Sequence, residues 1–100
     1  MIYITQLIFV KEGKEMVFQE FENFAIPLIE KYNGKLLYRL RPDDSVYVSA
    51  DSEKPYEIHI VSFDSEMDLQ QFMKDDTRLK FIHLKNESVK TMLLIKGEKM

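Results

Sequence analysis

Four ionisable side chains with chemical potential lie in two short apolar segments of the chain. Arg39 and Arg41 alternate along one segment, and Glu57 and His59 alternate along the other. Because side chains two residues apart point to the same side of a strand, each pair shares a face. His59 exchanges protons near neutral pH, so beside Glu57 and Arg39 it is the candidate catalytic base, or a group that orients an acidic substrate. The two guanidinium groups offer a planar fork to a carboxylate or phosphate ligand.

The same side chains also have a purely structural interpretation. His59 is then a buried histidine held by a cross-strand hydrogen bond, and the arginines pair with Glu57 or with a partner subunit. Tyr3 and Tyr38 are candidate ligand-binding residues if their rings face the same space, and otherwise they are strand aromatics in the core. His83 is expected at the surface or at the edge of a dimer. No metal site is predicted, since the only two histidines stand 24 residues apart in unrelated elements.

The first half of the chain predicts a strand followed by a long helix. Residues 2–10 are rich in β-branched and aromatic types, which is typical of a strand. From Glu15 onward, apolar residues recur every three or four positions and predict an amphipathic helix of about five turns. Its polar residues, Glu22 among them, are assigned to the solvated side. Pro27 predicts a kink or break, and Asn33-Gly34 predicts a left-handed stop.

The second half predicts three more strands and one broken helix. The strands are expected over 35–41, 56–63 and 90–96. The polar segment 42–55 is expected to be a loop, in which 46–50 extends an edge strand or forms a flap.

The second helix has a recognisable start and an interruption. Asp64 or Ser65 caps its first turn, and Asp68 completes a capping box with Ser65. The apolar pattern then falters at 74–77, where Asp76 or Thr77 is expected to cap a further short helix.

The resulting β-α-β-β-α-β order predicts an α+β fold made of one ferredoxin-like domain over residues 1–100. Right-handed crossovers place both helices on one face of a four-stranded antiparallel sheet. One alternating set on the middle strands is almost entirely apolar and is expected beneath the helices: Leu36, Tyr38, Leu40, Ile58, Ile60 and Ser62. The opposite set is mixed and is expected on the free face: Leu37, Arg39, Arg41, Glu57, His59, Val61 and Phe63. Such a mixture suits the inside of a barrel formed by two facing sheets.

Composition excludes several classes of function. The chain has no cysteine, so disulfides, thiolate metal sites and thiol nucleophiles are ruled out. A net charge of −3 without a basic cluster argues against nucleic acid as a partner. Three glycines cannot form a phosphate-binding loop. No apolar run reaches the ~20 residues of a membrane span, and 2–10 lacks the features of a signal peptide, so a cytoplasmic location is expected.

Several junctions resemble one known superfamily. They are Pro27 within the first helix, the segment 33–37, the segment 61–65 leading into the second helix, and the break at 75–77. These features are similar to those of the dimeric α/β barrel superfamily, which includes antibiotic-biosynthesis-type monooxygenases, EthD-like and NIPSNAP-like proteins, and families of unknown function. The resemblance implies a homodimer with a ferredoxin-like subunit. The acidic segment 42–55 is longer than in compact relatives and either roofs a pocket or decorates the surface.

Two functional hypotheses remain open at this point. In the first, a homodimer binds a small organic ligand, for example an anion. If this homodimer is an enzyme, its chemistry is cofactor-independent and of monooxygenase or isomerase type. His59 is its catalytic residue, and its ligand-binding residues are Arg39, Arg41, Glu57, Tyr38 and Tyr3. In the second hypothesis, the chain is a non-catalytic dimerising or regulatory module, and the same charges form salt bridges at the subunit interface.

Overall fold

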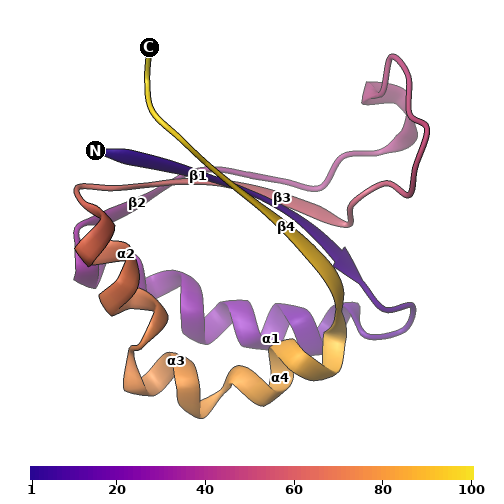
Figure 1. The fold of residues 1–100 in the computed structure, drawn as a ribbon. Helices are drawn as coiled ribbons and strands as arrows, with labels where there is room; N and C mark the ends of the chain where they lie inside the picture. The colour runs from indigo at the N-terminus through magenta and orange to yellow at the C-terminus, as the bar shows by residue number, and fades with distance from the viewer.

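All α-helices lie on one side of a single antiparallel sheet in the computed structural model, which describes residues 1–100 (Figure 1). The sheet consists of β1 (Ile2–Val10), β2 (Gly34–Leu40), β3 (Glu57–Phe63) and β4 (Val89–Gly97). Their spatial order is β2-β3-β1-β4, with β3 and β4 both antiparallel to β1. This topology confirms the predicted ferredoxin-like α+β fold.

The first helical segment follows the sequence prediction closely. Helix α1 covers Glu15–Ala25, and two 3₁₀ turns, η1 (Ile26–Leu28) and η2 (Glu30–Tyr32), continue it. Pro27 lies in η1, so the predicted break is confirmed. Asn33 ends the segment with φ of 59°, the left-handed stop expected there.

The second helical segment is divided into three parts: α2 (Glu66–Met73), α3 (Asp76–Lys80) and α4 (Ile82–Ser88). Ser65 caps α2, since its Oγ accepts a hydrogen bond of 3.1 Å from the Asp68 backbone N–H, as the capping box predicts. The predicted break is present, but the cap of α3 is Asp75 rather than Asp76 or Thr77. Asp75 Oδ1 accepts from the Arg78 backbone N–H at 3.0 Å.

The loop between β2 and β3 contains no strand. Its one regular element is η3 (Asp44–Val46), so the expectation of an edge strand over 46–50 is wrong. The loop projects beyond one end of the sheet, on the side away from the helices (Figure 1). None of the helices has the length and apolar character needed to cross a membrane.

The predicted assignment of the two sheet faces is wrong. Glu57, His59, Val61 and Phe63 all point toward the helices and are buried. The register agrees, since His59 pairs with Gln6 and Val61 pairs with the buried Ile4. The set expected beneath the helices lies instead on the free face, except Leu36, which packs against the core.

A β-bulge explains part of this reversal. The register between β2 and β3 shifts between Leu36 and Tyr38, so that Leu36 pairs with Val61 whereas Arg39 pairs with His59. Strict alternation along β2 would place Leu36 and Arg39 on opposite faces. The bulge brings both to the helix side. The free face therefore carries apolar residues from all four strands, among them Tyr38, Leu40, Leu93 and Ile95.

The hydrophobic core joins the sheet to the helices at the end where η2 meets β2. Its central cluster consists of Ile4, Ile29, Val61, Phe63 and Leu69. Gly34 begins β2 at this point, and a Cβ there would stand 2.6 Å from a ring carbon of Phe63 and 2.7 Å from Cγ2 of Ile29. The close approach of β2 to the core therefore requires glycine at this position.

Gly34→Ala should destabilise the fold, because the added methyl group would push Phe63 and Ile29 out of their packed positions. Overpacking of this kind typically costs about 1–3 kcal/mol of unfolding free energy. Gly97→Ala is the matched control, since a Cβ at Gly97 has no neighbour within 4 Å. Urea unfolding of both variants measures the difference, and equal unfolding midpoints would contradict the proposed packing.

Candidate functional site

A carboxylate at the start of β3 organises a network of buried charges. The Glu57 side chain has no solvent exposure, and its two oxygens accept hydrogen bonds from Arg39 Nε at 3.2 Å and Arg41 Nε at 2.7 Å. Arg39 also donates from Nη2 to Glu22 Oε1 at 2.8 Å. Gln19 Oε1 accepts from both arginines. The network thus ties β2 and β3 to helix α1.

His59 lies between two carboxylates within this network. Its Nε2 is 2.8 Å from Glu22 Oε2 and also contacts Glu57 Oε2. A ring nitrogen carries at most one proton and cannot donate fully to both carboxylates. Glu57 has further donors in the two arginines, whereas Glu22 Oε2 is buried and receives no well-aligned hydrogen bond. Glu22 is therefore the carboxylate that lacks a hydrogen-bond donor, at its Oε2 atom.

The protonation of the three groups follows from this geometry. Burial raises the pKa of Glu22, with a further rise from neighbouring Glu57, so this carboxyl holds a proton more readily than usual. Burial also opposes ionisation of Glu57, but hydrogen bonds from His59 and Arg41 outweigh it and lower the pKa of Glu57 well below its ordinary value. Burial alone would lower the pKa of His59, but the hydrogen bonds and negative charges of Glu22 and Glu57 outweigh it, so the pKa of His59 is raised above its ordinary value. The site can thus exchange a proton between Glu22 and His59.

The same three residues also have the donor atoms for a metal ion. One ligand atom from each of Glu22, Glu57 and His59 lies within 4.8 Å of the others. The carboxylates, however, already bond to Arg39 and Arg41, and a cation would have to displace or approach those positive charges. The donor set therefore fits an internal ion-pair network better than a metal centre.

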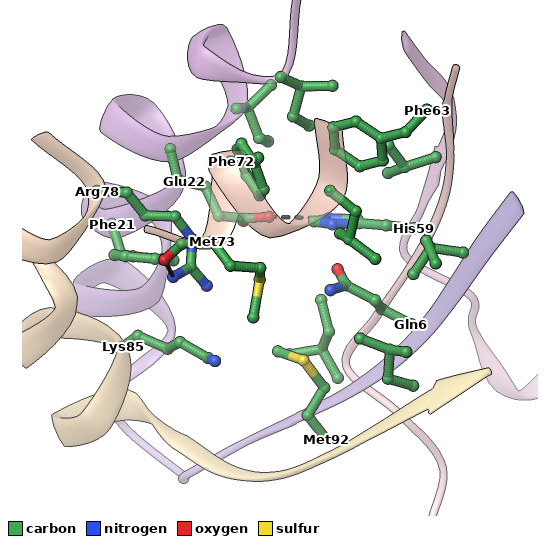
Figure 2. Close-up of a pocket in the computed structure, with 18 of the residues that line it drawn as sticks. Gln6, Phe21, Glu22, His59, Phe63, Phe72, Met73, Arg78, Lys85 and Met92 are labelled. Carbon is green, nitrogen blue, oxygen red and sulfur yellow. Dashed lines mark hydrogen bonds and ion pairs between the residues drawn. The ribbon is translucent and has the colours of Figure 1, made fainter. Parts of the chain in front are cut away.

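A cavity of about 110 Å³ lies between the sheet and the helices, next to this network. Fourteen of its nineteen lining residues are hydrophobic, which makes it an apolar chamber with few polar groups. Figure 2 shows Gln6 and His59 entering from the sheet and Glu22 from α1, with Arg78 and Lys85 on the helical side. Gln6 and His59 thus come from the sheet wall, whereas Glu22, Arg78 and Lys85 come from the helical wall.

Arg78 and Lys85 are the unusual members of the lining. Arg78 on α3 is 8 % exposed, and its guanidinium lies over the rings of Phe72 at 5.4 Å and Phe21 at 5.9 Å. Its side-chain hydrogen bond goes to the Met73 carbonyl oxygen at 3.2 Å. Neither Arg78 nor Lys85 forms an ion pair with a carboxylate.

Burial explains the titration of both cations. It lowers the pKa of Arg78, an effect that the nearby Asp75 partly offsets. It also lowers the pKa of Lys85, and the positive charge of Arg78 lowers it further. The helical wall of the cavity therefore carries positive charge that lacks a counter-ion.

The structure brings together four of the six residues predicted for the site. Arg39, Arg41, Glu57 and His59 form one network on the helix side of the sheet. Tyr3 and Tyr38 lie on the opposite face, where Tyr3 pairs with Ser62 and Tyr38 pairs with Ile60. Their hydroxyl groups cannot reach the cavity. His83 is exposed, as expected.

Three site residues escaped sequence reasoning. Glu22 was assigned to solvent, although it follows Phe18 by four residues and precedes Ala25 by three, which puts it on the apolar side of the helix. Its spacing could have identified it. Arg78 and Lys85 carry no such signal, because their position at the cavity depends on how the broken second helix packs.

Solved structures of low sequence identity share this architecture. A protein of unknown function from Rhodopseudomonas palustris has a TM-score of 0.84 at 12% identity, over 99% of this chain and 82% of that one. A candidate antibiotic biosynthesis monooxygenase from Nitrosomonas europaea has a TM-score of 0.75 at 12% identity, over 100% and 99% of the two chains. A NIPSNAP domain protein from Burkholderia xenovorans has a TM-score of 0.72 at 9% identity, over 100% and 95%. The chain has their ferredoxin-like fold.

These matches confirm, at the level of the fold, the expected resemblance to NIPSNAP and monooxygenase-type proteins, while the resemblance to EthD-like proteins stays a prediction. Two further structures of this fold, from Bacteroides fragilis and a Jannaschia species, are described as dimeric proteins of unknown function. No protein-family model and no curated protein matches the sequence. A shared fold does not carry an activity with it, so function must be argued from the site.

The raised pKa of His59 predicts how the stability contributed by this residue changes with pH. Stability contributed by its charge is complete below its ordinary value of 6.5 and is lost as pH rises through the folded-state pKa. His59→Gln should therefore cost more unfolding free energy at about pH 6 than at about pH 9. Urea unfolding at both pH values measures this difference, with the exposed His83→Gln as control.

An NMR titration tests the cause of the shift. The His59 ring signals should titrate with a midpoint above 6.5 in the wild type, and the midpoint should fall in Glu57→Gln, which removes one of the two carboxylate charges. A midpoint at or below 6.5 in the wild type would show that burial outweighs the carboxylates.

Proposed function

We propose that the protein binds a small organic anion in the cavity between the sheet and the helices. The observation that carries this proposal is the pair of cations, Arg78 and Lys85, lining an apolar chamber without a carboxylate partner. Leaving a cation buried and unpaired is costly in free energy. A ligand carboxylate would supply the missing charge, and the stacked guanidinium of Arg78 still has N–H donors to offer it.

The cavity volume limits the size of the ligand. An apolar cavity of about 150 Å³ accepts benzene, which has about six non-hydrogen atoms. The chamber here measures about 110 Å³, so about six non-hydrogen atoms is an upper limit unless the walls move. Small monocarboxylic acids fit this limit.

Glu22 and His59 support proton transfer on the bound ligand. Both line the cavity, His59 from the sheet and Glu22 from helix α1, and both have a raised pKa. A general base functions best when its pKa is close to the working pH, and burial moves Glu22 in that direction. Of the reaction types expected from the sequence, isomerase-like proton transfer is the one that these groups favour. Arg39, Arg41 and Glu57 then act as positioning residues that hold His59 and Glu22.

The alternative hypothesis, a non-catalytic dimerising or regulatory module, assigned the same charges to salt bridges at the subunit interface. The structure does not favour that assignment. Arg39, Arg41, Glu57 and His59 are instead paired within one chain, on the helix side of the sheet.

Isobutyrate should stabilise the protein against thermal unfolding, whereas isobutyramide, which has the same shape without the charge, should not. Arg78→Met should weaken isobutyrate binding by at least about tenfold, since a hydrogen bond between charged groups contributes about 1.5–3 kcal/mol. The apolar replacement of a buried charge by a group of similar volume is often neutral or stabilising, so the variant should fold. NMR chemical-shift titration measures the dissociation constants.

Lys80→Met is the matched control for this experiment, because Lys80 lies two residues from Arg78 on the same helix but is exposed. Its isobutyrate affinity should equal that of the wild type. Equal stabilisation by the acid and the amide, or unchanged affinity in Arg78→Met, would refute anion binding at this site.

We further propose that the free sheet face pairs with a second copy of the chain. Apolar side chains stand on this face with large exposed fractions, including Leu40 at 47 %, Leu93 at 52 % and Ile95 at 55 %. A continuous apolar surface of this kind is typical of an interface. Two solved proteins of the same fold are described as dimeric, which favours a second copy as the occupant.

Light scattering should give a mass near twice 11.9 kDa over a range of concentrations. Ile95→Glu should shift the protein to the monomer, because it places a charge in the apolar interface. Met67→Glu introduces the same charge at an exposed position on α2, away from the sheet face, and should leave the dimer intact. A wild-type monomer at all concentrations would refute the proposed pairing.

A further inference from the structure

Lys85 has an environment unlike that of any other lysine in the chain. It lies on α4, lines the apolar cavity, and forms no ion pair or side-chain hydrogen bond. Figure 2 shows its amino group directed into the chamber, on the same wall as Arg78. Several other lysines form salt bridges with carboxylates; Lys31 Nζ, for example, lies 3.2 Å from Asp75 Oδ2.

A lysine amine becomes a nucleophile when it loses its proton, and an apolar pocket or a neighbouring cation promotes that loss. Both conditions hold at Lys85. Burial lowers its pKa, and the charge of Arg78 adds to this effect. The neutral amine is therefore more populated than at an exposed lysine, and it faces a space in which a ligand can lie.

We infer that Lys85 forms an imine with a small oxo acid, whose carboxylate is bound by Arg78. This inference rests on the proposed binding of a small organic anion and names its chemical class. A carboxylate alone would satisfy Arg78, but a carbonyl carbon beside it would meet the amine on the same wall. Oxo acids combine both groups within the size that the cavity allows.

The step balances without any further reagent. The nitrogen of Lys85 attacks the carbonyl carbon, a C–N bond forms, and the carbonyl oxygen leaves as water. Starting from the ammonium form, two of its protons leave with that water, and the third stays on the iminium nitrogen. The iminium withdraws electrons from the neighbouring carbon, so a C–H proton there can pass to the Glu22 carboxylate, which lines the same cavity. Glu22 and His59 thereby keep the proton-transfer role proposed above.

Reductive trapping tests the inference directly. The protein is incubated with pyruvate and sodium cyanoborohydride, and the adduct is measured by intact mass and located by peptide mapping. Label should accumulate at Lys85 at least about tenfold faster than at exposed Lys80, because a held carbonyl and a neutral amine both favour the reaction. Lys85→Arg, which keeps the positive charge but removes the primary amine, should lose this label.

Two comparisons test the role of Arg78. Acetone has the carbonyl but no carboxylate and should label Lys85 more slowly than pyruvate does. Arg78→Met should remove the preference for pyruvate over acetone within the variant, and isobutyrate should block labelling in the wild type. Equal rates for the two carbonyl compounds would overturn the assignment of the carboxylate to Arg78.

The outcomes separate this inference from the proposed function. Label spread evenly over exposed lysines, or no label while isobutyrate still binds, would overturn imine formation and leave anion binding intact. Failure of both isobutyrate binding and labelling would overturn the two together. Selective label at Lys85 that isobutyrate blocks would support both.

Discussion

The buried carboxylate of Glu57 is the constraint on which the arrangement of the sheet and helix α1 depends. A charge without solvent exposure is tolerated only when cations and hydrogen bonds surround it. Arg39 in β2 and Arg41 just after its end supply them, and His59 supplies a third contact from β3 itself. Arg39 then extends to Glu22 on α1, so the strand at the sheet edge and the helix above it share one set of charges. Removing Glu57 would take a partner from Arg39, Arg41 and His59 at once.

This network also explains why a cavity exists where it does. Charged groups fill the space between sheet and α1 at one end, and the Phe63 cluster fills it at the other. The helix that closes the space is interrupted at Asp75, whose carboxylate caps α3. Hydrogen bonds from the Tyr32 hydroxyl and the Arg78 amide lower the pKa of Asp75 to about 2, so the cap stays ionised. The break thus fixes the start of the helix that carries Arg78, and straight helical packing would not present that residue to the cavity.

The helices and strands could be predicted from the sequence more accurately than the two faces of the sheet could be assigned. Strand β1 has the expected bounds, and Pro27, Asn33 and Ser65 act as anticipated, because each of these signals is local. The face assignment failed because it assumed that the more apolar set belongs beneath the helices. The charges on the other set are satisfied by one another and by Glu22, which is more than thirty residues from His59 in the sequence. A bulge in β2 also breaks the alternation. The positions of Arg78 and Lys85 on the helical wall depend on tertiary packing, and no periodicity in the sequence indicates them.

The two faces of the sheet carry different side chains, and this separation bears on where a ligand and a second copy are proposed to lie. A barrel formed by two facing sheets invites a search for the ligand inside the barrel, and the charged residues of β2 and β3 favoured that placement. Those charges lie on the helix side of the sheet, and the free face is apolar. The proposed association and the proposed ligand binding therefore use the same strands but different side chains, since neighbours along a strand point to opposite faces. A substitution on the free face is accordingly expected to leave the cavity unchanged.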